Sequence, residues 1–200
     1  KESPAFHYQM IEDLGRYARN AQAAPRGFGK SVVMGIEVPL LLLLTRPYFN
    51  ITLAMATDKL IQERFGRLMA EFEENPHIIS DFGQIKPPRG SAKTWNHSFL
   101  NLHHNGAKIL GISVMGRKRG GRPILFLMDD PEFDPEETSG SSNSQYILTE
   151  KYESILFRQV IPMLAKGSAM FWVGTMINRR CLLYKACEAN ANRFKVWMRR

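Results

Sequence analysis

The feature that most constrains this chain is a short glycine-bearing segment, Ala24-Pro25-Arg26-Gly27-Phe28-Gly29-Lys30-Ser31. It matches the P-loop pattern of nucleotide-binding proteins except that Ala24 replaces the first glycine. Gly27 and Gly29 allow backbone amides to converge on phosphate oxygens, and a helix beginning near Lys30 directs its positive end at them. Lys30 can reach the β- and γ-phosphates, and Ser31 can coordinate magnesium. The segment therefore predicts a site for ATP with Mg²⁺.

The residues around this segment have the order expected of a P-loop fold. A short strand precedes the loop, and a helix follows it into a leucine-rich run, where Pro39 removes one backbone donor and is expected to bend the helix. Residues 49–56 predict a strand. Asp58–Glu74 predicts a helix with Thr57 at its N-cap and with separate charged and apolar faces. Together these elements predict a βαβ unit.

The rest of the chain predicts further alternating elements. Residues 7–21 carry apolar side chains at helical spacing, which predicts a helix ending near Asn20. Asn105-Gly106 is a hairpin signal between expected strands at 98–103 and 108–114. The remaining expectations are loops at 74–90 and 135–144, buried strands at 123–128 and 169–173, helices at 145–164 and 179–189, and a last strand at 193–198. We therefore expect one α/β domain over residues 1–200, with a mainly parallel sheet, helices on both faces and a β-hairpin insertion.

The second half of the predicted site is an apolar strand that ends in two carboxylates, Asp129 and Asp130. A strand with this near-continuous apolar run is typical of the centre of a parallel sheet. Asp129 is expected to hold Mg²⁺ through its water shell. Either Asp130 or Glu132 is expected to polarise the water that attacks the γ-phosphate, and the pattern leaves that choice open.

Five features occur together in this chain: the Pro-Arg-Gly-x-Gly-Lys-Ser loop with Arg26, the pair Tyr8-Gln9, a Gly-Arg-rich segment before Asp129, the run Asp129-Asp130-Pro131-Glu132, and an apolar strand ending in Gly174-Thr175. As a set they resemble the ATPase domain of a tailed-phage large terminase, the motor that packages double-stranded DNA into a procapsid. The likeness covers nearly the whole chain, although some helicases share most of these features. It implies a P-loop NTPase of the additional-strand, catalytic-glutamate (RecA-like) type.

The resemblance also implies roles and partners. Gln9 resembles an adenine-reading glutamine, and Gly174-Thr175 resembles the coupling motif that senses the γ-phosphate. The expected nucleotide contacts are Gln9, Pro25, Arg26, Gly27, Phe28, Gly29, Lys30, Ser31, Val32 and Thr175. The expected partners are double-stranded DNA, a portal protein, a small terminase subunit and further copies in a homo-oligomeric ring, in the cytoplasm of an infected bacterial host. The nuclease domain usual in this family has no counterpart in the sequence, so we expect no DNA cleavage.

A basic segment at residues 116–122 contains Arg117, Lys118, Arg119 and Arg122 among glycines. Either Arg117 or Arg119 can act in trans as an arginine finger on a neighbouring subunit's nucleotide, and Arg26 can instead serve as a finger in cis. The alternatives are a solvated basic turn or a contact with DNA phosphates.

Composition narrows the partners. A net charge of +8 and a pI near 9.7 favour polyanionic partners, with nucleic acid first among them.

Other residue types argue against a membrane span, a disulfide framework and a histidine metal site. The most apolar run, residues 38–44, is far shorter than the roughly 20 residues that cross a bilayer. Cys181 and Cys187 are too few for a disulfide framework and suggest buried thiols in a reducing compartment. His103 and His104 are expected on opposite faces of a strand, which disfavours a shared metal.

Two rival functions fit the same motifs. One is a superfamily 2-like helicase or translocase, which shares the P-loop and the paired carboxylates. The other is a nucleotide-gated DNA-binding module, in which Asp130 cannot replace a catalytic glutamate and ATP is bound without turnover.

Overall fold

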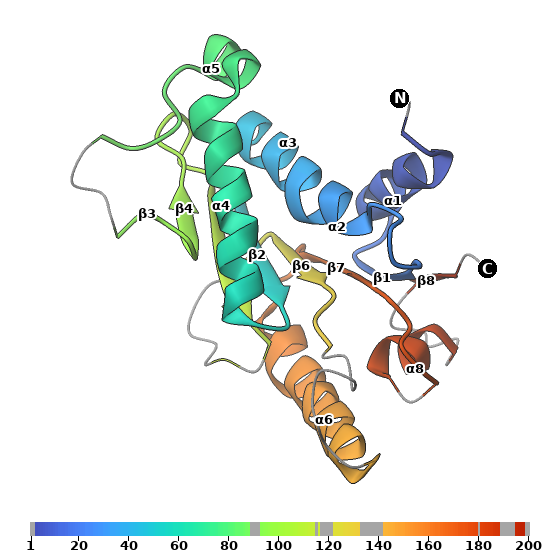
Figure 1. The fold of residues 1–200 in the computed structure, drawn as a ribbon. Helices are drawn as coiled ribbons and strands as arrows, with labels where there is room; N and C mark the ends of the chain where they lie inside the picture. Colours follow the sequence, from blue (N-terminus) through green and yellow to red (C-terminus); the bar gives the residue numbers. More distant parts are fainter. Residues whose placement is uncertain are drawn as a thin grey trace.

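The central element is an eight-stranded sheet with the order β3-β4-β5-β2-β6-β7-β1-β8. The computed structural model describes residues 3–88, 93–114, 116, 122–132, 142–179, 181–188 and 195–198 (Figure 1). The strands are β1 Arg19–Ala23, β2 Asn50–Met55, β3 Trp95–Asn96, β4 Phe99–Asn101, β5 Lys108–Ser113, β6 Leu125–Asp129, β7 Ala169–Gly174 and β8 Lys195–Met198. The six strands from β5 to β8 in this order pair in parallel, and β3, β4 and β5 pair antiparallel.

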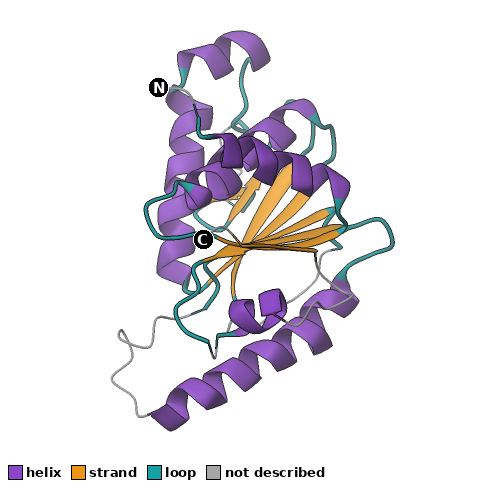
Figure 2. Cartoon of the chain, turned by 90° about the vertical axis from the view of Figure 1, so that its right-hand side faces the viewer, coloured by secondary structure: helices purple, strands orange, loops and turns teal. Residues whose placement is uncertain are grey.

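Helices cover both faces of this sheet, as Figure 2 shows. The helical segments are α1 Ala5–Arg16, α2 Lys30–Val32, η1 Val33–Glu37, α3 Val38–Thr45, α4 Asp58–Glu74, α5 Pro76–Phe82, α6 Ser142–Ile155, η2 Leu156–Val160, α7 Ile161–Met163 and α8 Leu182–Glu188. One apolar core joins the sheet to α1, the α2-η1-α3 segment and α4. A second core joins the opposite face to α6, η2 and α8.

The central strands feed both cores because successive residues of a strand point to opposite faces. In β6, Leu125 and Leu127 belong to the first core, whereas Phe126 and Met128 belong to the second. Asp129 continues the first series and therefore faces the layer that contains the helix after the P-loop. This register decides on which face the site is built.

Two of the helical segments contain a π-helical stretch shortly before a proline. The segment from Lys30 to Thr45 is π-helical at Val33–Glu37, and Pro39 follows. The segment ending at Met163 is π-helical at Leu156–Val160, and Pro162 follows. Proline has no N–H and its ring clashes with the carbonyl four residues earlier, so a widened turn before it relieves the conflict. The predicted disturbance at Pro39 is therefore a π-helical turn.

Most predicted elements are confirmed, including Asp58–Glu74 with its Thr57 cap, where the Thr57 side chain accepts from the Leu60 N–H (3.2 Å). The hairpin across Asn105-Gly106 also forms, although β5 belongs at the same time to the parallel part of the sheet. The predicted helix end near Asn20 is wrong, because Asn20 pairs in β1 between β7 and β8. The predicted loop at 74–90 is wrong in part, since it contains α5, capped by the Asn75 side chain.

Gly111 tests the contact between β5 and α4. A Cβ there would lie 2.7 Å from Phe65 Cε2 and still closer to Ile61 Cγ2, both in the first core. We expect Gly111→Ala to lower the unfolding free energy by about 1–3 kcal/mol, because overpacking displaces these side chains. Thermal denaturation followed by circular dichroism measures the effect.

The matched control is Gly15→Ala in α1, where nothing lies within 4 Å of the added Cβ. This variant should be neutral or more stable by roughly 0.5–1 kcal/mol, as expected for Gly→Ala in an exposed helix. Equal thermal midpoints for both variants would contradict the described packing of α4 on β5.

Candidate nucleotide-binding site

The candidate site lies where three neighbouring strands end. β6, β7 and β1 are parallel neighbours, so their carboxyl ends meet at one edge of the sheet. β1 continues into the P-loop at Ala24, β6 ends at Asp129, and Thr175 follows β7. The Ala24 N–H donates to the Gly174 carbonyl (3.1 Å), which fixes the start of the loop beside Thr175. One strand therefore separates the P-loop strand from the strand that carries Asp129, as the additional-strand type requires.

The P-loop turns through two glycines with positive φ. The φ angles are 81° at Gly27 and 72° at Gly29, in the left-handed region that residues with a side chain rarely adopt. The Gly29 carbonyl accepts from the N–H groups of Val32 (2.9 Å) and Val33 (3.0 Å), so the helix begins directly at the loop. The first N–H groups of a helix have no partner within it and carry its positive end. The loop thus presents backbone donors suited to phosphate oxygens.

Helix α1 supports this loop from outside. His7 Nε2 donates to the Phe28 carbonyl (2.8 Å), and the rings of Phe6 and Phe28 lie 5.6 Å apart. A Cβ on Gly29 would lie 3.2 Å from the His7 ring. The side chains of α1 with described contacts to the loop are therefore those of Phe6 and His7, whereas Gln9 is exposed on the same helix.

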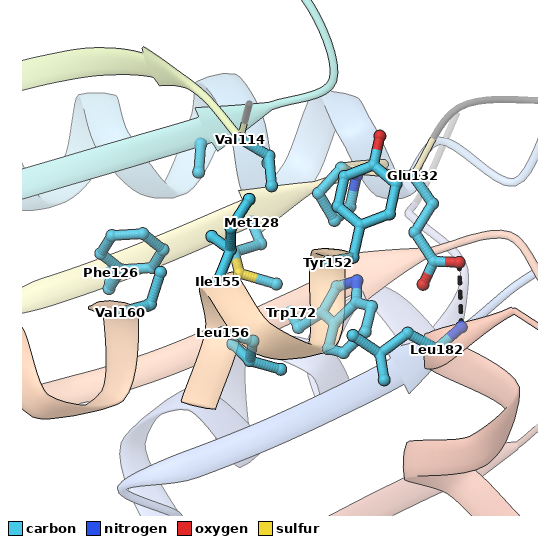
Figure 3. A pocket seen from close by; sticks show the side chains of 12 residues that line it. Val114, Phe126, Met128, Glu132, Tyr152, Ile155, Leu156, Val160, Trp172 and Leu182 are labelled. Atoms are coloured by element: carbon cyan, nitrogen blue, oxygen red, sulfur yellow. Dashed lines mark hydrogen bonds between the residues drawn. The ribbon is translucent and has the colours of Figure 1, made fainter. Parts of the chain in front are cut away.

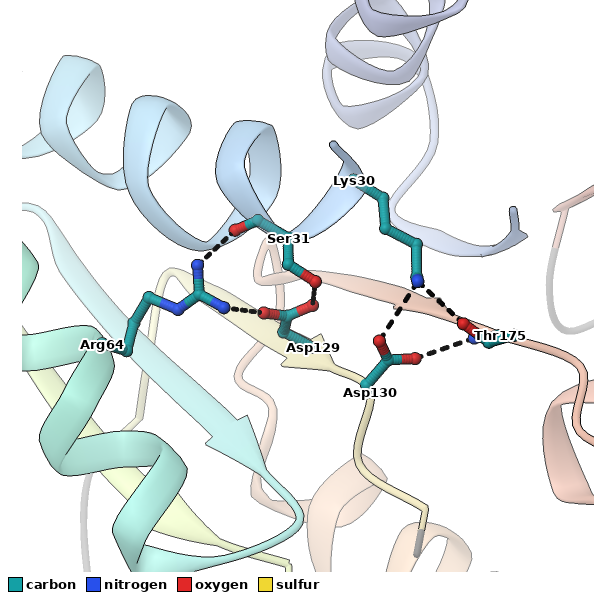
Figure 4. A network of polar contacts seen from close by, with 6 residues as sticks. All are labelled: Lys30, Ser31, Arg64, Asp129, Asp130 and Thr175. Carbon is teal, nitrogen blue, oxygen red and sulfur yellow. Dashed lines mark hydrogen bonds and ion pairs between the residues drawn. The ribbon is translucent and has the colours of Figure 1, made fainter. Parts of the chain in front are cut away.

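Lys30 is the buried cation of the site. Its side chain is 6% exposed, and Nζ donates to Thr175 Oγ1 (2.8 Å) and lies 3.2 Å from Asp130 Oδ2 (Figure 4). The Thr175 N–H donates to the other oxygen of Asp130 (2.8 Å). Asp130 itself has a positive φ of 40°, where the chain turns away from β6. Lys30 at the start of α2, Asp130 after β6 and Thr175 after β7 therefore form one hydrogen-bonded group.

Ser31 and Asp129 form a second group beside the first. Ser31 Oγ donates to Asp129 Oδ1 (2.7 Å), and Arg64 Nη2 donates to Asp129 Oδ2 (2.8 Å). Burial raises the pKa of Asp129, and the charge of Arg64 and the hydrogen bond from Ser31 act in the opposite direction. Burial likewise lowers the pKa of Arg64, against the charge of Asp129. Arg64 and Asp129 thus compensate each other's burial.

Glu132 lies apart from both groups. Its two carboxylate oxygens accept from the backbone N–H groups of Leu182 (3.0 Å) and Leu183 (2.9 Å), at the start of α8. Burial raises the pKa of Glu132, and these two hydrogen bonds lower it. In Figure 3 the carboxylate lies at one end of an apolar cavity of about 20 Å³ that Tyr152 and Trp172 also line. A space of that size holds about one water molecule and not a nucleotide.

The other predicted contact residues lie at or near the loop surface. Five of them are exposed to solvent: Pro25, Arg26, Gly27, Phe28 and Val32. Arg117 and Arg119 lie outside the described residues, so the structure does not test the predicted finger.

Arg64 and His7 are contact residues that the sequence interpretation missed. The signal for Arg64 was present, because it is a cationic residue in the helix that follows β2, the strand beside β6. The expected strand position of His103 and His104 is wrong, because both residues lie in the turn between β4 and β5, where His104 Nε2 lies 3.3 Å from the Leu44 carbonyl.

The donor set fits magnesium. The Ser31 hydroxyl donates a hydrogen bond to Asp129, which leaves the lone pairs of the Ser31 oxygen available for a cation. Hydroxyl and carboxylate oxygens are the ligands that Mg²⁺ prefers. In the part of the chain that the structure describes, no group of three or more His, Cys, Asp or Glu side chains could hold a metal ion. Ser31 and Asp129 are the residues whose oxygen atoms would hold Mg²⁺ here.

Comparison with known proteins identifies the fold. No protein-family model and no curated protein matches the chain. Among solved structures, the large terminase of bacteriophage HK97 is similar with a TM-score of 0.59 and 15% identity, over 94% of this chain and 36% of that one. The large terminase ATPase domain of Thermus phage P74-26 is similar with a TM-score of 0.56 and 14% identity, over 87% of this chain and 70% of that one. A point mutant of that domain gives 0.62 and 12%, over 98% of this chain and 86% of the mutant chain.

These identities are too low to carry more than the fold, and the chain spans about a third of the HK97 protein. No helix among the described residues is both long and apolar enough to cross a membrane. The geometry of the sheet and loop agrees with the comparisons: this chain has the RecA-like P-loop fold of phage large terminase ATPase domains.

Proposed function

We propose that this chain is a Mg²⁺-dependent ATPase whose site is the P-loop from Ala24 to Ser31. The observation that carries the proposal is the position of Lys30, a buried cation held by Asp130 and Thr175 at the mouth of the glycine loop. A lysine there can transfer its contacts to the β- and γ-phosphates of a bound nucleotide. Gln9 is proposed to read adenine, and Arg26 to contact the phosphates or act as a finger in cis.

The roles of the two carboxylates follow from their neighbours. Asp129 accepts a hydrogen bond from the Ser31 hydroxyl, so these two residues would together hold the metal ion. A bound metal ion would neutralise the charge that develops on the phosphates. Asp130 lies beside Lys30 and Thr175, where a γ-phosphate would lie against both. The Asp130 side chain is 42% exposed, so its carboxylate can also reach a water molecule. We therefore propose Asp130 as the general base and Thr175 as the residue that senses the γ-phosphate.

Glu132 is the weaker candidate for this base. Both of its oxygens are engaged by the start of α8, and reaching the loop would require it to release two backbone N–H groups. Its proposed role is to tie the segment after β6 to α8.

At the level of the whole protein we propose a DNA-packaging motor. The supporting observations are the shared fold of the phage terminase ATPase domains and the net charge of +8, which suits double-stranded DNA. The proposed partners are DNA, a portal protein, a small terminase subunit and neighbouring copies in a ring, in the cytoplasm of an infected bacterium. Measuring ATP hydrolysis with and without double-stranded DNA tests this, and nucleotide binding without turnover would favour the nucleotide-gated binding module instead.

Lys30→Ala should lower ATP turnover by about 10²–10³-fold or more and weaken nucleotide binding, because the charge placed at the phosphates is lost. A phosphate-release assay measures turnover. Lys59→Ala, an exposed lysine on α4, is the matched control and should turn over ATP like the unmodified chain. Retained activity in Lys30→Ala would overturn the P-loop assignment.

Asp130→Asn should keep ATP binding and lose turnover by about 10²–10⁴-fold, because an amide cannot accept the proton of the attacking water. Glu132→Gln should retain turnover within a few-fold and lower the unfolding free energy by about 1–2 kcal/mol, since it gives up one charge-assisted hydrogen bond. Single-turnover hydrolysis and thermal denaturation separate the two effects. The reverse pattern would move the general base to Glu132.

The proposed trans finger demands a neighbouring subunit. Arg117→Ala or Arg119→Ala should leave the ATP affinity of the dilute chain unchanged but remove the rise in specific activity when subunits assemble. Mixing the finger variant with Lys30→Ala subunits should restore activity, because each supplies what the other lacks. No complementation between variants shown to co-assemble would return this segment to the alternative role of holding DNA phosphates.

A further inference from the structure

Arg64 is a cation inside the site that neither the P-loop pattern nor the paired carboxylates account for. It comes from the middle of α4, and its side chain is 12% exposed while that of Asp129 is 2% exposed. Burying a guanidinium is costly unless the charge is paired and hydrogen-bonded. The placement of Arg64 therefore needs a specific reason.

The contacts of Arg64 join the two residues proposed to hold the metal. Nη2 donates to Asp129 Oδ2 (2.8 Å), and Nη1 donates to the backbone carbonyl of Ser31 (2.5 Å), as Figure 4 shows. The planar guanidinium makes both contacts at once through two different nitrogen atoms. A lysine ammonium is a single point charge and has no such fork. Arg64 thus fixes the Ser31 backbone relative to the Asp129 carboxylate.

Arg64 approaches Asp129 on the oxygen that Ser31 does not use. Asp129 Oδ1 accepts from the Ser31 hydroxyl and Oδ2 from Arg64, so both oxygens are oriented. The hydroxyl proton stays directed at the carboxylate, and the remaining lone pairs of Ser31 Oγ stay available for a cation. Arg64 therefore orients the ligand pair without blocking the serine.

The surrounding backbone leaves room for this arrangement. Gly35 lies one helical turn after Ser31, and a Cβ there would lie 3.0 Å from Arg64 Cζ and 3.1 Å from Asp129 Oδ2. Such contacts are tighter than van der Waals packing allows without movement. A residue larger than glycine at position 35 would press on the ion pair from the side of the P-loop helix.

We propose that Arg64 is a positioning residue for Mg²⁺: by holding the Ser31 carbonyl and Asp129 together, it keeps the metal ligands in place when nucleotide binds. This inference rests on the proposed nucleotide site and deepens it. The competing possibility is a latch, in which the Arg64–Asp129 ion pair must break before Mg²⁺ binds. The two ideas predict opposite effects of removing Arg64.

The test measures how much Mg²⁺ strengthens ADP binding. A fluorescent ADP is titrated into the full chain with Mg²⁺ and with a chelator, and the ratio of the two affinities is the readout. Partners behind a metal ligand typically contribute 10–100-fold to metal affinity. Arg64→Ala should therefore reduce the Mg²⁺-dependent gain about 10-fold or more and leave the affinity in chelator near that of the unmodified chain.

Two further variants keep the test valid if Arg64→Ala does not fold. Arg64→Lys retains the charge but loses the paired contacts, and it should give a smaller reduction of the same ratio. Gly35→Ala removes no functional group and should also reduce the ratio, by displacing the ion pair. Lys59→Ala, at an exposed cation on the same helix, is the matched control and should leave the ratio unchanged.

The outcomes separate the ideas. An unchanged ratio in folded Arg64→Ala and Arg64→Lys would overturn the proposal, and an increased ratio would establish the latch in its place. Equal losses with Mg²⁺ and with chelator would also overturn it, because Arg64 would then shape the whole loop. If the unmodified chain binds no ADP under either condition, the proposed function itself fails.

Discussion

The candidate site depends on the nearly buried ammonium group of Lys30, which needs partners for its charge and its hydrogen bonds. Asp130 supplies the charge and Thr175 the hydroxyl, and both come from neighbouring strand ends. This arrangement requires β1, β7 and β6 to run in parallel and to end at one edge. The order of strands in the sheet is thus a condition for the proposed chemistry, and the alternating residues of each strand decide which side chains face each core.

The segment after β6 connects two regions of the molecule. Asp130 contacts the P-loop lysine and the residue after β7, whereas Glu132, two residues later, holds the start of α8. The helix after the P-loop and α4, which carries Arg64, cover one face of the sheet, and α8 lies on the opposite face. A few residues of backbone link the position expected for the γ-phosphate to that opposite layer.

Much of the fold and of the candidate site could be predicted from the sequence, because the motifs that specify them are local. The P-loop glycines, the Thr57 cap and the apolar run before Asp129 each specify their own structure. The end of α1 was misplaced because the alanines near Asn20 suit a helix, and pairing with β7 and β8 decides otherwise. Arg64 was missed because its partners Ser31 and Asp129 are remote in sequence. Our proposal of Asp130 over Glu132 likewise rests on the contacts of Glu132 with the start of α8, which no local pattern contains.

A structure of the chain with Mg²⁺ and a non-hydrolysable ATP analogue would test the proposed nucleotide site. We predict that the β-phosphate contacts the backbone amides between Gly27 and Ser31, that Lys30 Nζ moves from Asp130 to the phosphates, and that Mg²⁺ lies on Ser31 Oγ with Asp129 behind it. A nucleotide bound elsewhere, or a Lys30–Asp130 contact that persists with the phosphates outside the loop, would contradict it.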